Sequence, residues 1–256
     1  MTQLTDAAAA HAPASTGDAS SRRTARTTAL LYLGLAVAGV VSFMLIRPSL
    51  FEPGDPAATL ANLVDSPGTA RLGIAAEMAV VVTQALAAMW FFRLFRAVDA
   101  FAAGAIAVFG LVNAVVILVS AGFLATALDV ALEPVGDPGT AQLLYLASDN
   151  MWGVGALFFG LWLIPMGWCV LQTPSMPRAL GWVLVGGGVG YVLSAFVRYL
   201  VPGAGALVDL AAIPATIGEL WIIGYLLVRG LGGVPLPDRK AEWRTRASVP
   251  TTSVPG

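Results

Sequence analysis

Histidine, cysteine and lysine are nearly absent from this chain of 256 residues, which contains one of each. The histidine, His11, lies in a polar N-terminal stretch, so the apolar remainder has no histidine for a metal site, a haem or a Ser–His hydrolase. The lysine, Lys240, lies in a polar C-terminal stretch, which excludes a Ser–Lys pair from the apolar region. The cysteine, Cys169, excludes an internal disulfide, and its apolar neighbours predict a small buried side chain.

Charge is also scarce. Charged residues make up 11% of the chain and hydrophobic residues 57%, whereas soluble domains are about a quarter charged. So much apolar surface cannot be hidden in one soluble core, and the sequence therefore predicts an integral membrane protein whose main partner is the lipid bilayer. Because lipid offers the backbone no hydrogen bonds, the spanning segments must be helices. The expected fold class is all-α, a polytopic transmembrane helical bundle.

Six apolar runs are long enough to cross the hydrocarbon core, which takes about 20 residues of helix. The predicted spans are residues 27–46, 71–92, 100–124, 148–171, 179–199 and 209–228. We expect residues 1–26 and 229–256 to be polar, disordered tails, of which the second is basic. A short surface helix is expected over TAQLLYLA, in the loop before the fourth span. No second domain is predicted.

Basic residues are distributed unevenly between the two sides that six spans define. The side with both termini carries eleven of the 14 lysines and arginines, and the other side carries Arg47, Arg71 and Arg198. Because basic residues near span ends are kept in the cytoplasm, both termini are predicted to be cytoplasmic. The abundance of alanine, glycine, valine and arginine is typical of a GC-rich bacterium, so we expect a multi-pass protein of the bacterial inner (cytoplasmic) membrane.

The fourth and fifth spans form a predicted hairpin that is rich in glycine. The fifth contains GGGVG, in which Gly186 and Gly190 have the GxxxG spacing that lets helices approach closely in lipid. A phosphate-binding loop would need a preceding strand and an exposed helix N-terminus, and this run is embedded in a span. We therefore predict that these glycines form a packing surface between helices.

Two carboxylates, Glu77 and Glu219, lie well inside predicted spans. An ionisable group at the bilayer centre costs about 2.5–3.5 kcal/mol, so each should face protein or a water-filled cavity. Pro214, five residues before Glu219, predicts a kink in the sixth span beside that carboxylate. The other polar residues expected in the interior or at its outer edge are Gln84, Asn113, Asp149, Tyr191 and Arg198.

These polar residues support more than one function. In the leading interpretation they form a network that holds helices together in a protein of structural or accessory function. In the alternative, Glu219 and Glu77 bind a proton, a cation or a small polar molecule from the extracytoplasmic side, with Arg198 as counter-charge, in a transporter or ligand sensor. The second alternative is an intramembrane enzyme, for which we assign no catalytic residue, metal ligand or cofactor. No nucleic-acid partner is expected, and the sequence predicts no oligomeric state.

Parts of the sequence are similar to a known family. The stretches FFGLWLIPMGWCVLQTPSMPRALGWVLVGGGVGYVL and IGELWIIGYLLVRG resemble the signature of the bacterial membrane family catalogued as domain of unknown function 4386. RRTARTTALLYLGLAVAGVVS resembles its opening segment, and the resemblance extends over about residues 22–230. The third span departs from the family pattern, which has an arginine or glutamate near Asn113. The resemblance implies a six-helix integral membrane protein and places Glu219 on the family's glutamate, but the family has no established activity to carry over.

Overall fold

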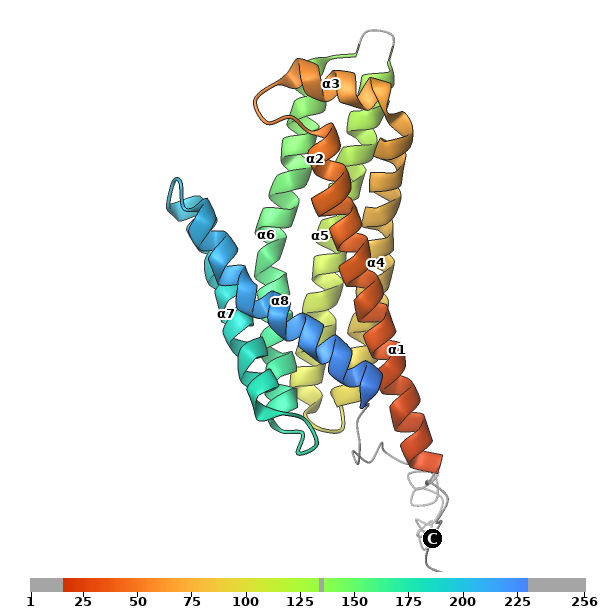
Figure 1. Ribbon diagram of the computed structural model, residues 1–256, viewed down its shortest axis with the longest axis vertical. Coiled ribbons are helices and arrows are strands. Elements are labelled where there is room, and N and C mark those ends of the chain that lie inside the picture. Colours follow the sequence, from red (N-terminus) through yellow and green to blue (C-terminus); the bar gives the residue numbers. More distant parts are fainter. Residues whose placement is uncertain (1–15, 134–135, 230–256) are drawn as a thin grey trace, which may run out of the picture.

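The computed structural model of the protein describes residues 16–133 and 136–229, and every regular element in these ranges is helical (Figure 1). The first span has three pieces, α1 (Thr16–Gly39), the π-helix η1 (Val40–Ile46) and α2 (Arg47–Leu50), and the short α3 (Pro56–Asp65) follows it. The later helices are α4 (Pro67–Phe95), α5 (Ala100–Leu132), α6 (Pro138–Leu171), α7 (Arg178–Leu200) and α8 (Gly205–Val228). Within the described residues, six segments are long and apolar enough to cross a membrane, which confirms the predicted all-α bundle of six spans.

The outside of the bundle is apolar on every span. Large exposed hydrophobic side chains include Met44, Met78, Leu118, Leu146, Leu193 and Leu220, one from each spanning segment. A soluble monomer rarely exposes apolar surface on this scale, whereas lipid solvates it well. The protein is therefore a multi-pass membrane protein.

The bundle has two distinct ends. Figure 1 shows that α1 begins and α8 ends at the same end, which we call the terminal end. Helix α3 lies across the opposite end, which we call the α3 end. An even number of spans requires this arrangement, because each crossing takes the chain to the other side.

The helices extend beyond the predicted spans. Helix α1 begins at Thr16, so residues 16–26, assigned from the sequence to a disordered tail, are helical. The buried residues of this extension and of the turn after it are Ser21, Thr24, Ala25, Thr28 and Ala29. Their spacing of three and four residues forms one helical face, so packing continues past the polar boundary. Residues 1–15 and 230–256 of the predicted tails lie outside the described ranges.

The surface helix predicted over TAQLLYLA is not a separate element, because α6 runs without a break from Pro138 to Leu171. Asp137 caps the first turn by accepting hydrogen bonds from the Thr140 hydroxyl and from the Thr140 backbone N–H, the latter over 2.8 Å. These bonds hold the pKa of Asp137 below its ordinary value. Pro138 sits in the first turn, where its missing N–H leaves no bond unmade. The cap therefore starts a helix of 34 residues, about nine turns long, well outside the apolar run.

Glycines bring α6 and α7 into backbone contact, as the sequence predicted for this hairpin. A Cβ added to Gly160 would lie 2.5 Å from the carbonyl oxygen of Gly188. One added to Gly167 would lie 2.6 Å from the carbonyl oxygen of Gly181. No side chain fits at such distances, so close approach of the two helices depends on glycine at these positions.

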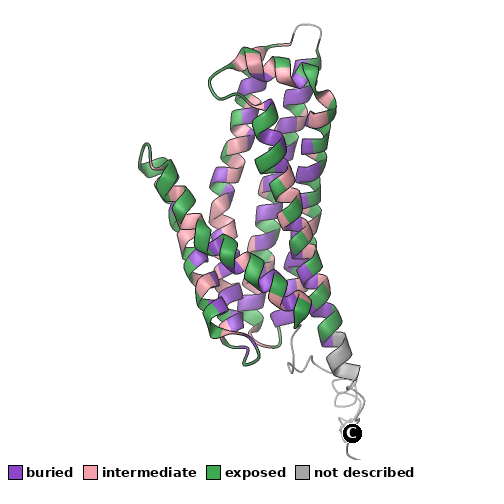
Figure 2. Cartoon of the chain, in the orientation of Figure 1, coloured by how far each residue is buried: buried purple, intermediate pink, exposed green. Residues whose placement is uncertain are grey.

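Helix α8 packs against α7 and against α1. Glycine again permits the contact, because a Cβ added to Gly187 of α7 would lie 2.5 Å from the Cα of Ala215. Gly190 likewise abuts Ala211, whereas Gly186 has nothing within 4 Å, so only one member of the predicted GxxxG pair is used. Away from the terminal end the α7–α8 hairpin diverges from the bundle, and exposed residues dominate there (Figures 1 and 2).

The first span is irregular where α1 gives way to η1 and α2. A π-helical stretch is rare and occurs often at functional sites. Pro48 in α2 has no backbone N–H to donate to the preceding turn, which favours the irregularity. Arg47, which lies just outside the predicted span 27–46, is instead the start of α2 and only 6% exposed. Because Arg47 is buried, it can form the main ion pair of the interior.

Candidate functional site

The first of two polar centres inside the bundle is an ion pair. Nη2 of Arg47 donates a hydrogen bond to Oε1 of Glu77 on α4 over 2.8 Å. The two side chains are 7% and 0% exposed. Charges buried to this degree lose their hydration, so they are tolerated only where the partner's charge and further hydrogen bonds compensate.

Helices α5 and α6 supply further contacts to this pair. Nε1 of Trp152 donates to Oε1 of Glu77 over 3.1 Å, and Nη2 of Arg47 donates to Oγ of Ser148 over 2.8 Å. The hydroxyl of Ser148 lies 2.7 Å from that of Ser120 on α5. We call these five residues the Arg47 centre. It joins the first span to α4, α5 and α6.

Some atoms of the Arg47 centre are buried without a partner among the described residues. They are Nε and Nη1 of Arg47 and Oε2 of Glu77. The ring of Phe43, whose centroid lies 5.3 Å from the guanidinium carbon of Arg47, adds a cation–π contact but no hydrogen bond. The protein alone therefore leaves donors and an acceptor that suit a small polar guest such as water.

A pair of amides lies between α4 and α5. Nδ2 of Asn113 donates to Oε1 of Gln84 over 3.0 Å, and both side chains are fully buried. Nε2 of Gln84 and Oδ1 of Asn113 have no partner among the described residues. Gln84 lies two turns of α4 beyond Glu77, so the amide pair extends the polar interior toward the terminal end.

The second polar centre lies nearer the terminal end, where α8 meets α1. The hydroxyl of Tyr32 donates to Oε1 of Glu219 over 2.6 Å. Tyr32 is buried, and its ring lies edge-on to Phe91 at 5.4 Å and to Trp162 at 5.2 Å between centroids, which fixes its orientation. Glu219 is half-buried and forms no ion pair with any described residue. Tyr191 of α7 interacts electrostatically with this carboxylate, and we call Tyr32, Tyr191 and Glu219 the Glu219 centre.

Aromatic side chains connect the two centres. Phe43 lies 5.2 Å from Trp152, Trp152 stacks on Phe159 at 6.3 Å, and Phe159 lies 6.0 Å from Tyr191, all between ring centroids. We call these four residues the aromatic row. Phe43 is exposed, and the other three are partly buried side chains that pack against the core, so the row lies at the edge of the core. Trp152 belongs to the Arg47 centre and Tyr191 to the Glu219 centre, so the row runs from one to the other.

Two further predicted residues meet at the α3 ends of α6 and α7. Nη2 of Arg198 donates to Oδ2 of Asp149 over 3.2 Å, and the side chains are 40% and 31% exposed. Beside this pair the hydroxyl of Tyr199 donates to Oδ1 of Asn150 over 3.4 Å. An exposed ion pair contributes little to stability, because water and salt screen it. These contacts mark the rim of the α6–α7 hairpin.

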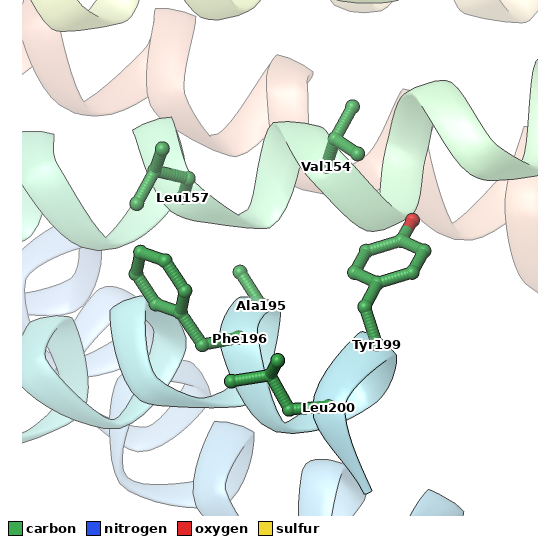
Figure 3. A pocket seen from close by; sticks show the side chains of 6 residues that line it. All are labelled: Val154, Leu157, Ala195, Phe196, Tyr199 and Leu200. Atoms are coloured by element: carbon green, nitrogen blue, oxygen red, sulfur yellow. The ribbon is translucent and has the colours of Figure 1, made fainter. Parts of the chain in front are cut away.

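Next to this rim, α6 and α7 separate around an apolar pocket of about 250 Å³ (Figure 3). It is lined by Val154, Leu157, Ala195, Phe196, Tyr199 and Leu200. No charged side chain is among them, so the pocket suits an apolar group such as a lipid chain. It contains neither of the two glutamates, so it is separate from the binding site that the transporter alternative places at Glu219 and Glu77.

The structure brings together some of the predicted site residues. The pairs in contact are Gln84 with Asn113 and Asp149 with Arg198, and Tyr191 lies within electrostatic range of Glu219. Glu77 and Glu219 lie in separate centres, and the cation beside Glu77 is Arg47 instead of Arg198. Among the described residues, no three His, Cys, Asp or Glu side chains lie together in a group that could hold a metal ion.

Sequence reasoning missed Arg47, Tyr32, Ser148 and Trp152 as members of the two centres. Arg47 stands at the end of an apolar run and before a proline, which is the usual mark of a loop. Tyr32 and Trp152 stand inside or at the edge of apolar runs, where aromatic residues commonly pack or anchor the helix at the interface. Their hydrogen bonds depend on which helices are neighbours, and the sequence pattern carries no such information.

Comparison with known proteins supports the family suggested by the hairpin and the closing motif. No curated protein and no solved structure matches the chain. One family model matches residues 27–230, which take in nearly the whole of the six spans and both polar centres. Its description names no activity. The chain belongs to the family described as domain of unknown function (DUF4386).

Proposed function

We propose that this protein is a membrane carrier that binds a small solute or cation at the Glu219 centre, while the Arg47 centre holds the bundle together. The observation that carries this proposal is the contrast between the two intramembrane glutamates. Glu77 is fully buried and paired with an arginine at 2.8 Å. Glu219 is half-buried, and its strongest described contact is the neutral hydroxyl of Tyr32.

An unpaired carboxylate in a membrane needs a positive partner. A proton or a bound cation can neutralise Glu219, and both compete for the same oxygens. Competition of this kind couples the two, because binding of one favours release of the other. Glu219 is thus suited to exchange a solute for a proton, and Glu77, whose charge Arg47 already balances, is not.

Two of the three helices that form the Glu219 centre, α1 and α8, contain an irregularity that favours movement. Helix α8 carries Pro214 five residues before Glu219, and α1 passes into the π-helix η1 eight residues after Tyr32. Discontinuous helices beside an intramembrane charge are a recurring feature of transporter sites. A change at either break would move Tyr32 relative to Glu219 and so alter access to the carboxylate.

The setting of the proposed carrier follows from the charge distribution. The excess of arginine at the terminal end favours a cytoplasmic location for both termini in a bacterial inner membrane. The α3 end, with the Asp149–Arg198 pair, would then face the extracytoplasmic side. The solute would reach Glu219 from that side along the aromatic row.

Proton movement in reconstituted liposomes tests this function. The full chain is placed in liposomes that contain the pH-sensitive dye pyranine, and sodium, potassium, small amines, amino acids or sugars are added outside. We expect wild-type protein to move protons in response to at least one of these solutes. Glu219→Gln should abolish the movement, because an amide cannot exchange a proton, and should leave insertion and folding intact.

Asp209→Asn is the matched control, because Asp209 is an exposed carboxylate on the same helix. It should retain the wild-type response. A Glu219→Gln protein that moves protons at the wild-type rate contradicts the proposal. So does a wild-type protein that responds to none of these solutes above protein-free liposomes.

A structural or accessory role is the second candidate, and the Arg47 centre favours it. Its five residues tie four of the spans together. Tyr32 would then serve only to hold α8 against α1 through Glu219. In that case Glu219→Gln lowers thermal stability and no solute produces proton movement, which is the reverse of the carrier's expected behaviour.

A further inference from the structure

The Glu219 centre offers little to an inorganic cation. Metal cations such as Mg²⁺ and Ca²⁺ need six or more oxygen ligands, several of them charged or carbonyl oxygens. The interactions described at Glu219 are the hydrogen bond that the Tyr32 hydroxyl donates to its carboxylate and an electrostatic interaction with Tyr191. Among the described residues, Glu219 belongs to no group of three or more His, Cys, Asp and Glu side chains that could hold a metal ion. The chemistry around it is aromatic.

Aromatic rings attract cations that have lost their water. A cation within about 6 Å of a ring centroid interacts favourably with its face, and the effect is stronger in a site shielded from water. Tyr191 and Phe159, which are partly exposed, extend from Glu219 along α7 and α6. Trp152 continues the row by stacking on Phe159. A ligand that placed a positive charge at Glu219 would therefore have ring faces beside its body.

The other end of the aromatic row already shows this combination at work. There the guanidinium of Arg47 donates to Glu77 over 2.8 Å and lies 5.3 Å from the ring centroid of Phe43, which in turn packs on Trp152. A carboxylate, rings and an organic cation thus occur together in the Arg47 centre. At the Glu219 centre the carboxylate and the rings are present, and no described arginine or lysine pairs with them.

We propose that the Glu219 centre binds an organic cation with an apolar or aromatic body, such as a substituted ammonium or phosphonium ion. Glu219 supplies the counter-charge, and Tyr191 and Phe159 supply the ring faces. This inference rests on the proposed carrier function and names the class of solute that the carrier takes. An anion of the same shape is rejected, because the unpaired carboxylate repels it.

Binding of tetraphenylphosphonium by the purified full chain in detergent tests this inference. Equilibrium dialysis with the radiolabelled cation gives its dissociation constant, and a separate dialysis with radiolabelled tetraphenylborate, an anion of the same shape, measures anion binding. We expect saturable binding of the cation, and no saturable binding of the anion. Glu219→Gln should weaken binding at least about tenfold, because it removes a counter-charge in a site of low dielectric.

Two further comparisons separate charge from ring. Asp209→Asn removes an exposed carboxylate from the same helix and should leave the dissociation constant unchanged. Tyr191→Leu should weaken binding about threefold to tenfold, and Tyr191→Phe, which keeps the ring, should not. If Glu219→Gln does not fold, the comparison of Tyr191→Leu with Tyr191→Phe tests the inference instead.

The inference is overturned if wild-type protein does not bind tetraphenylphosphonium, or if Glu219→Gln binds it with the wild-type constant. It is also overturned if tetraphenylborate, dialysed alone, binds as tightly as the cation, or if Tyr191→Leu and Tyr191→Phe behave alike. Failure here is distinguishable from failure of the carrier. Glu219-dependent proton movement without binding of the cation overturns only the ligand class. Glu219-dependent binding of the cation without solute-driven proton movement overturns only the carrier function.

Discussion

Glu77 and Glu219 are the same residue type in the same bundle, yet their surroundings give them different tasks. Oε1 of Glu77 accepts from Arg47 and from Trp152, and its side chain is fully buried. Oε1 of Glu219 accepts from Tyr32, and the residue remains partly exposed. A carboxylate that is balanced and inaccessible stabilises a fold, whereas one that is unbalanced and accessible is available to a ligand.

At this scale, Glu77→Gln should destabilise the protein. The amide leaves the guanidinium of Arg47 buried without a counter-charge, and breaking a buried pair in this way costs about 3–5 kcal/mol. Thermal unfolding of the purified variant in detergent measures the loss. The double variant Arg47→Met with Glu77→Leu should recover most of it, because neither charge is then left alone.

Arg71→Gln is the control, because Arg71 is an exposed arginine on the same helix as Glu77. It should unfold at the wild-type temperature. If Glu77→Gln and Arg71→Gln unfold together with the wild type, the Arg47 centre does not hold the bundle.

Part of the candidate site could be predicted from residue types alone. The other members depend on which helices are in contact. Both glutamates were found because charge inside an apolar run is costly and therefore informative. Arg47 was not predicted as a site residue, because its buried position depends on the π-helical stretch before it. No periodicity in the sequence predicts that stretch. Tyr32 was not predicted as a site residue, because its hydrogen bond to Glu219 joins residues 187 positions apart.

Helices α6 and α7 are closely packed, and glycine makes this packing possible. Their backbones meet at Gly160 with Gly188 and at Gly167 with Gly181. The hairpin was predictable, because small residues in a span favour close approach. Which glycines would be used was not, since Gly186 of the GxxxG pair faces open space and its neighbour Gly187 packs on α8 instead.

Gly160→Ala should therefore loosen this pair of helices. Its Cβ would lie 2.5 Å from the backbone oxygen of Gly188, which cannot move aside as a flexible side chain would. Overpacking of this kind costs about 1–3 kcal/mol, and the loss is measured by thermal unfolding in detergent.

Gly186→Ala is the matched control in the same pair of helices, because nothing lies within 4 Å of its added Cβ. It should unfold at the wild-type temperature or slightly above, since alanine favours helix by about 1 kcal/mol over glycine. Equal destabilisation by both substitutions would contradict the packing described for α6 and α7.

For the whole molecule, hydropathy predicted the number of spans because lipid imposes one rule on every segment that crosses it. The ends of the spans were less accessible to sequence reasoning. Polar caps such as Asp137 start a helix outside the apolar run, and small polar residues such as Thr24 and Thr28 extend one. The oblique course of α8 across α7 and α1 depends on glycine contacts that hydropathy does not report.

The orientation of the whole molecule is a prediction of the charge distribution. In a Cys169→Ser background, Ser66→Cys lies at the α3 end and Ser175→Cys in the turn between α6 and α7 at the terminal end, and both positions are exposed. A membrane-impermeant maleimide applied to intact cells should label Ser66→Cys and spare Ser175→Cys. Labelling of Ser175→Cys instead would place the termini outside and reverse the proposed direction of solute entry.

The proposed roles of the two glutamates, binding for Glu219 and stability for Glu77, are tested most directly by one measurement. It is the melting temperature of the purified protein with and without tetraphenylphosphonium. Glu219→Gln is expected to melt at the wild-type temperature and to lose the rise that the cation produces in wild type. Glu77→Gln is expected to melt lower and to keep that rise. A Glu219→Gln protein that keeps the full rise, or a Glu77→Gln protein that melts with the wild type, would contradict the assignment of binding to Glu219 and of scaffold to Glu77.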